Sequence, residues 1–138
     1  MGWSFPRIPA KWQVQEGLGL QAQEGDFPSS LAATQESLGG ITLPEFVEFQ
    51  INMLKNYLRD PAIEPVVPLR ISGGEETLAL DVRHKTKDGK ELVYRRIYAR
   101  NANAVGVLTV TALASELPQV MENLAPALNG VSFQRAAA

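Results

Sequence analysis

The strongest structural signal in this chain lies in residues 77–113, which read TLALDVRHKTKDGKELVYRRIYARNANAVGVLTVTAL. In the first part, Leu78, Leu80 and Val82 alternate with polar residues, which is the period of a β-strand with one buried face. Asp88-Gly89 follows, and this dipeptide is typical of a tight turn between antiparallel strands. The stretch is therefore predicted to form a β-hairpin continued by a third strand.

A two-residue turn at Asp88-Gly89 would set the register of this hairpin and so assign its faces. It places Arg83 opposite Tyr94. Farther along, it places Asp81 opposite Arg96, where the two side chains could form a cross-strand ion pair. The core is then predicted to lie on the other face, which holds Leu78, Leu80, Val82, Val93, Ile97 and Ala99.

The third strand is predicted over residues 105–113, after a second two-residue turn near Ala102-Asn103. This turn adds three further apolar residues to the core face, namely Leu108, Val110 and Ala112. Val107 and Thr109 join the opposite face of the sheet.

The clearest helix signal covers residues 43–59. Thr42 and Glu45 have the spacing of a capping box, and Pro44 is tolerated in a first helical turn. The apolar residues behind the cap recur at steps of three and four, and are predicted to form a wide core-facing stripe of Phe46, Val47, Phe49, Met53, Leu54, Tyr57 and Leu58.

A shorter helix is predicted over residues 116–129, with Ser115 as its N-cap, Pro118 in its first turn and Gly130 after its end. Further short strands, separated by Gly or Pro, are predicted at residues 12–15, 17–23, 30–38 and 66–71. The expected fold is thus a single α+β domain over residues 1–138. In it, an antiparallel β-sheet of about five to seven strands packs against one long and one shorter α-helix.

Composition removes several classes of function. The chain has 13 Lys and Arg against 15 Asp and Glu, so it lacks the basic surplus of a nucleic-acid-binding protein. It has no cysteine, and the single His84 cannot form a histidine cluster, so a structural or surface role is expected for it. We therefore expect no catalytic residues, no metal site and no cofactor.

Targeting signals are also not expected. The segment Met1–Pro9 contains two prolines and does not resemble a secretory signal, and no stretch is apolar over the length that spans a bilayer. A cytoplasmic protein without direct membrane insertion is predicted. An exported protein whose signal lies upstream of Met1 stays open as an alternative.

The candidate functional surface is the sheet face opposite the predicted core. It combines aromatic rings with guanidinium donors, a mixture suited to binding a peptide or protein. Its predicted partner-binding residues are Arg83, Tyr94, Arg96, Tyr98, Val107 and Thr109. The alternative interpretation is an ordinary solvated sheet face, on which Asp81 and Arg96 form a weak surface ion pair.

Several loose motifs resemble those of a known superfamily. They are the opening Phe5-x-x-Ile8-Pro9-x-x-Trp12-Gln13, the strand Ser30-Leu31-Ala32-Ala33-Thr34 followed by Gly40-x-Thr42-Leu43, the segment from Gly89 through Leu92-Val93-Tyr94-Arg95-Arg96-Ile97-Tyr98, and Val107-Leu108-Thr109-Val110-Thr111-Ala112. Over nearly its whole length the chain resembles the PsbP/DcrB-like superfamily, and within it the DcrB-related bacterial proteins that include Eag-type chaperones of type VI secretion effectors.

The resemblance implies an α+β fold with no enzymatic activity and no obligatory cofactor. For the Eag-type branch it implies a homodimer whose sheet surface shields hydrophobic helices of a secreted effector. The matching surface residues would be Tyr94, Arg96, Tyr98, Val107 and Thr109. On this interpretation, Arg96→Glu or Tyr98→Asp should abolish partner binding and leave stability nearly unchanged. The alternative is a structural or assembly-factor domain of the exported PsbP-like type, with no chaperone role.

Overall fold

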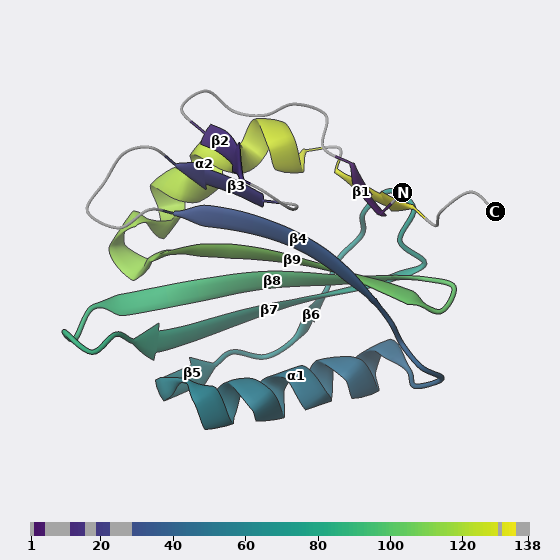
Figure 1. Cartoon of the computed structure of the whole chain (residues 1–138), viewed down its shortest axis with the longest axis horizontal. Helices are drawn as coiled ribbons and strands as arrows, with labels where there is room; N and C mark the ends of the chain where they lie inside the picture. The colour runs from purple at the N-terminus through teal and green to yellow at the C-terminus, as the bar shows by residue number, and fades with distance from the viewer. Residues whose placement is uncertain (1, 5–11, 16–18, 23–28, 130, 135–138) are drawn as a thin grey trace.

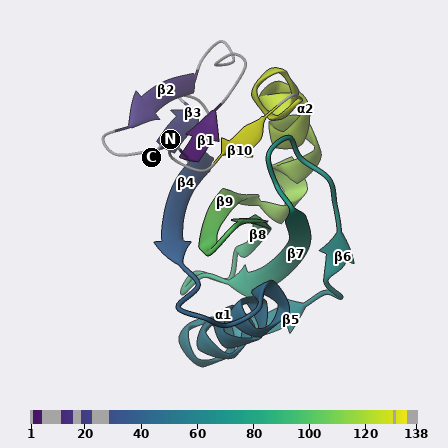
Figure 2. The same cartoon turned by 90° about the vertical axis from the view of Figure 1, so that its right-hand side faces the viewer.

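The computed structural model describes residues 2–4, 12–15, 19–22, 29–129 and 131–134. A curved antiparallel β-sheet forms the centre of the molecule, with helix α1 (Leu43–Tyr57) on one face and helix α2 (Leu117–Leu128) on the other (Figure 1). The turned view in Figure 2 shows the two helices on opposite sides of the same sheet. The predicted α+β fold is confirmed.

Seven strands follow one another across the sheet, and every pairing between them is antiparallel. Their order is β2 (Trp12–Gln15), β3 (Gly19–Ala22), β4 (Ser30–Ser37), β9 (Ala104–Leu113), β8 (Glu91–Asn101), β7 (Glu76–Lys85) and β5 (Arg59–Ile63). The short β6 (Val67–Pro68) also pairs with β7, and a separate two-stranded sheet joins β1 (Gly2–Ser4) to β10 (Ser132–Gln134).

Helix α1 begins as the sequence predicts. The Glu45 N–H donates to the Thr42 hydroxyl at 3.2 Å, and the Thr42 N–H donates to the Glu45 carboxylate at 3.0 Å, which together form a capping box. The helix ends two residues earlier than expected, because strand β5 begins at Arg59. The sequence analysis missed β5 because it contains Pro61, yet a proline is tolerated on an edge strand, where its missing N–H breaks no ladder.

Helix α2 differs from its prediction at the N-terminus. A 3₁₀ turn occupies Ala114–Glu116, so Ser115 lies inside that turn and does not cap the helix, whose N-cap is Glu116. Pro118 lies in the first turn as expected. The predicted stop at Gly130 lies outside the described residues.

The hairpin register is shifted by one residue from the predicted one. Thr86 and Lys90 close a three-residue loop, in which the Thr86 N–H donates to the Lys90 carbonyl at 2.8 Å and the Thr86 hydroxyl donates to Asp88 at 2.6 Å. Gly89 takes the left-handed conformation that such a loop needs, with φ of 83°. The prediction of a two-residue turn is therefore wrong, although the Ala102-Asn103 turn has the predicted length.

The shift changes which residues share a face, since one residue of register moves a side chain to the other side of a sheet. Val82 now lies opposite Tyr94, and Leu80 lies opposite Arg96. The six residues assigned to a single core face are therefore divided. The α1 side takes Leu78, Leu80 and Val82, and the α2 side takes Val93, Ile97 and Ala99.

Both faces of the sheet consequently carry a hydrophobic core. The core under α2 contains Leu31, Ala33, Val93, Leu108, Val110, Ala112, Leu117, Val120, Leu124 and Val131. The core under α1 contains Leu38, Leu43, Phe46, Val47, Leu54, Leu80, Val82, Tyr98, Val105 and Val107. Because α1 covers only part of its face, the rest of that face is available as a surface, and the candidate site lies there.

Candidate functional site

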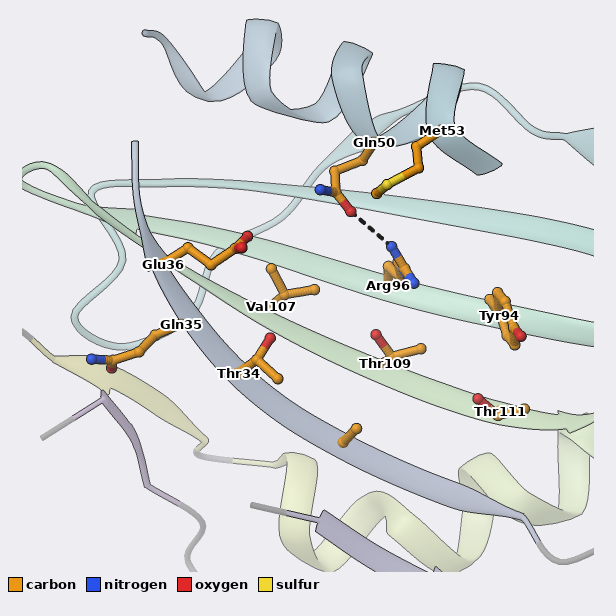
Figure 3. Close-up of a pocket in the computed structure, with 11 residues that line it drawn as sticks. Thr34, Gln35, Glu36, Gln50, Met53, Tyr94, Arg96, Val107, Thr109 and Thr111 are labelled. Carbon is orange, nitrogen blue, oxygen red and sulfur yellow. Dashed lines mark hydrogen bonds between the residues drawn. The ribbon is translucent and has the colours of Figure 1, made fainter. Parts of the chain in front are cut away.

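A groove of about 590 Å³ lies on the α1 side of the sheet, between α1 and β4 (Figure 3). Its floor comes from β8 and β9. The lining residues are Ala32, Thr34, Gln35 and Glu36 of β4, Gln50 and Met53 of α1, Tyr94 and Arg96 of β8, and Val107, Thr109 and Thr111 of β9. Its volume is within the range of about 300–1,000 Å³ that is usual for ligand sites.

Four of the six predicted partner-binding residues meet in this groove. Arg96 lies directly opposite Thr109 in the ladder between β8 and β9, and Tyr94 and Val107 each lie two residues along a strand from one of them. The period of a strand therefore brings all four side chains to one face. The structure confirms the predicted pairing of β8 with β9 that this placement requires.

Arg96 is half-buried and is held in place by neutral groups. Its Nη1 donates to the Gln50 amide oxygen at 3.0 Å (Figure 3). The same Nη1 donates to the Tyr98 hydroxyl at 3.4 Å. The guanidinium carbon lies 5.7 Å from the centre of the Tyr94 ring, which is a cation–π distance. The buried Nε has no hydrogen-bond partner among the residues that the structure describes. The groove thus holds a fixed positive charge that donates its hydrogen bonds to uncharged groups.

Arg83 does not belong to this surface, and the prediction that it shares a face with Tyr94 is wrong. With the corrected register it pairs with Val93 and points to the other side of the sheet. There its guanidinium lies 3.4 Å from Glu64 and 3.5 Å from Glu91. These are exposed ion pairs, which contribute little to stability.

Tyr98 has the predicted face but not the predicted exposure. Its side chain is 0% exposed and makes an edge contact with Phe46 of α1, with 6.1 Å between ring centres. Burial raises the pKa of the Tyr98 phenol, and the Arg96 guanidinium opposes this shift. Tyr98 is therefore a core residue that positions Arg96 and does not contact a partner directly.

Asp81 pairs with Arg95 and not with Arg96. The Arg95 Nε and Nη2 donate to the two carboxylate oxygens of Asp81 at 2.9 and 2.8 Å, on the face away from the groove. This two-point hydrogen bonding raises the pKa of Arg95. The predicted Asp81–Arg96 pair is wrong for the same reason as the predicted register.

Helix α1 exposes apolar residues that the sequence analysis assigned to the core. Phe49, Met53 and Tyr57 are 63%, 43% and 80% exposed, and their four-residue spacing places them along one side of the helix. Met53 also lines the groove. The unusual width of the apolar stripe was the available signal, because the buried residues of the helix are only Leu43, Phe46, Val47 and Leu54.

Strand β4 contributes the polar wall of the groove. Glu36 points from β4 towards Val107, and Gln35, the residue before it, points to the other side of the strand (Figure 3). Sequence reasoning could not place these residues in the site, since β4 lies some 60 residues before the strands of the floor and their adjacency depends on tertiary pairing.

His84 lies beside the groove as a buried, neutral side chain, consistent with the structural role predicted for it. Its ring centre is 4.5 Å from that of Tyr94, and Nε2 has no hydrogen-bond partner within the described part of the chain. Burial lowers the pKa of His84 below the ordinary value of 6.5.

We expect this burial to make stability depend on pH. The unfolded chain binds a proton near pH 6.5 and the folded chain binds it only at lower pH, so the free energy of unfolding should fall as pH decreases below 6.5 and level off below the folded pKa. Urea unfolding between pH 7.5 and 5 measures this slope. The His84→Leu variant should show a smaller slope in this window, and an unchanged slope would contradict the assignment.

No group of three His, Cys, Asp or Glu side chains that could hold a metal ion occurs within the described residues. Neither helix of the described chain is long and apolar enough to cross a membrane.

No family model and no curated protein matches this sequence. The solved structures that are similar in fold include PA94 and LpqN. PA94 of Pseudomonas aeruginosa, a protein of unknown function, has a TM-score of 0.65 and 20% sequence identity, over 88% of this chain and 90% of PA94. LpqN of Mycobacterium tuberculosis, described as involved in cell envelope biogenesis, has a TM-score of 0.71 and 17% identity, over 96% of this chain and 83% of LpqN. At these identities the likeness shows that this chain shares the fold of the two proteins.

Proposed function

We propose that this protein is a non-enzymatic binding protein that holds an apolar helix of a protein partner in the groove between α1 and β4. The observation that carries the proposal is the composition of the groove. Tyr94, Val107 and Met53 supply apolar surface, and Arg96 and Thr109 supply fixed polar groups between them. Such a surface can cover an apolar helix and also hydrogen-bond its polar groups.

The size of the groove limits how much of a partner it can hold. The groove floor runs along β9 from Val107 to Thr111, which is about 13 Å at 3.3 Å per residue, and a helix covers that length in about nine residues at 1.5 Å per residue. The exposed ridge of Phe49, Met53 and Tyr57 beside it extends the apolar surface along α1. A longer helix would therefore lie partly in the groove and partly along this ridge.

The partner class follows from the superfamily resemblance. We infer an adaptor or chaperone that shields the hydrophobic helices of a type VI secretion effector in the cytoplasm before secretion. A homodimer would present two such grooves, and this would suit a client with more than one hydrophobic helix.

Photo-crosslinking in the host cell tests this proposal. A benzoylphenylalanine at position 109 stands on the groove floor, and the same residue at position 87 stands in the exposed hairpin loop. We expect position 109 alone to crosslink one protein with hydrophobic helices. Arg96→Glu should remove that crosslink because it reverses the charge in the groove, and Arg83→Glu, on the opposite face, should not. Equal crosslinking from both positions, or none from position 109, would contradict the proposal.

A second candidate function is favoured by the likeness to LpqN, whose description places it in cell envelope biogenesis. On this alternative the chain is an exported structural or assembly domain. Fractionation of the same crosslinked cells distinguishes the two, because the exported form would be recovered outside the cytoplasm.

A further inference from the structure

Arg96 differs from the other arginines of the two central strands β7 and β8. Each of the other three has a carboxylate partner, at 3.4, 2.8 and 2.9 Å in the pairs Arg83–Glu64, Arg95–Asp81 and Arg100–Glu75. Arg96 donates only to the uncharged oxygens of Gln50 and Tyr98, and no carboxylate of the described residues lies within ion-pair distance of it. Three of these four arginines are therefore paired with at least one carboxylate, and Arg96 is paired with none among the described residues.

The missing partner matters because Arg96 is partly withdrawn from water. A guanidinium stays charged at all accessible pH values, and a buried charge without a counter-charge is costly. Its buried Nε–H has no acceptor among the described residues, although buried donors are nearly always satisfied. The side chain is nevertheless held rigidly by Gln50, Tyr98 and the Tyr94 ring. The Arg96 guanidinium is therefore already oriented to form an ion pair with a carboxylate that a bound partner supplies.

The groove is also electrically polarised along its length. Glu36 lies opposite Val105 on β9, and Arg96 lies opposite Thr109, four residues farther along the same strand. At about 3.3 Å per residue, the two charges are separated by about 13 Å along the strand direction. An anionic group is therefore attracted to the Arg96 end of the groove and repelled from the Glu36 end.

We propose that the segment bound in the groove carries a carboxylate, which forms an ion pair with the Arg96 guanidinium while the apolar residues of the segment pack on Val107 and Met53. The inference rests on the proposed function and adds the chemistry and the direction of the bound helix. The C-terminal end of the helix, which has partial negative charge, lies at Arg96, and its N-terminal end lies towards Glu36. The carboxylate comes from an acidic side chain in the last turn or from the C-terminus of the segment itself.

Three dansyl-labelled peptides test the proposal with the full chain. All are 12-residue Ala/Leu-rich helices: the first has Glu in its last turn and an amidated C-terminus, the second has Gln and an amidated C-terminus, and the third has Gln and a free C-terminal carboxylate. We expect one or both acidic peptides to bind at least about tenfold more tightly than the uncharged one, measured by fluorescence anisotropy. Arg96→Gln should remove this preference, and Arg83→Gln should retain it.

Each outcome separates this inference from the function on which it rests. If all three peptides bind with equal affinity, the groove binds helices and the carboxylate inference is overturned. If none binds, the proposed function fails together with the inference. A preference that survives Arg96→Gln would exclude Arg96 as its source.

Should circular dichroism show that Arg96→Gln does not fold, Arg96→Lys provides the test. It keeps the charge but loses the planar guanidinium, and should therefore weaken the preference. Glu36→Gln should leave the preference intact.

Discussion

Tyr98→Ala should lower the free energy of unfolding by about 3–5 kcal/mol, the range observed when a buried aromatic side chain is truncated. Tyr98 is completely buried between the sheet and α1, where its ring contacts Phe46 and its hydroxyl accepts a hydrogen bond from Arg96. Truncation leaves a cavity under the helix and removes that acceptor. Urea unfolding followed by circular dichroism measures the change.

Tyr57 provides a matched control for this experiment. It is the last residue of α1, but its side chain is 80% exposed, so Tyr57→Ala should change the free energy of unfolding by no more than about 0.5 kcal/mol. If Tyr98→Ala were as mild as Tyr57→Ala, Tyr98 would not be the core residue described above. The same burial changes the expectation for Tyr98→Asp, which should unfold the domain and is therefore unsuitable for testing partner binding.

Leu124→Ala should lower the free energy of unfolding by about 2–5 kcal/mol, because it leaves a cavity in the core between α2 and the sheet. Leu124 is 0% exposed and belongs to the cluster that joins α2 to the sheet, which also contains Val93 and Leu108. Chemical denaturation against Leu69→Ala, a truncation at a leucine that is 42% exposed, provides the comparison.

The two cores should nevertheless unfold in one transition. Strands β8 and β9 contribute to both, since Val93 and Leu108 face α2 and Tyr98 and Val107 face α1. Loss of either core therefore removes support from the same strands. A variant of Leu124 that melted α2 in a separate, earlier step would show that α2 is an independent unit and would contradict this expectation.

The sequence alone determined the features that depend on neighbouring residues. The capping box at Thr42 and Glu45, the helix that follows it, the alternating strands and the two-residue turn at Ala102-Asn103 all have local causes, and the structure contains each of them. The grouping of Tyr94, Arg96, Val107 and Thr109 on one face was also predictable, because it depends only on strand period and on that turn.

The tertiary structure decided the features that depend on distant residues. The three-residue loop at Thr86–Lys90 moved Arg83 to the other face, because a single residue of register reverses every side chain of a strand. Where α1 lies on the sheet determined that Tyr98 is buried and Phe49 exposed, since both have the apolar character of core residues. The groove exists only because α1 and β4 leave part of the sheet face formed by β8 and β9 uncovered. No local pattern in the sequence predicts how far α1 lies from β4.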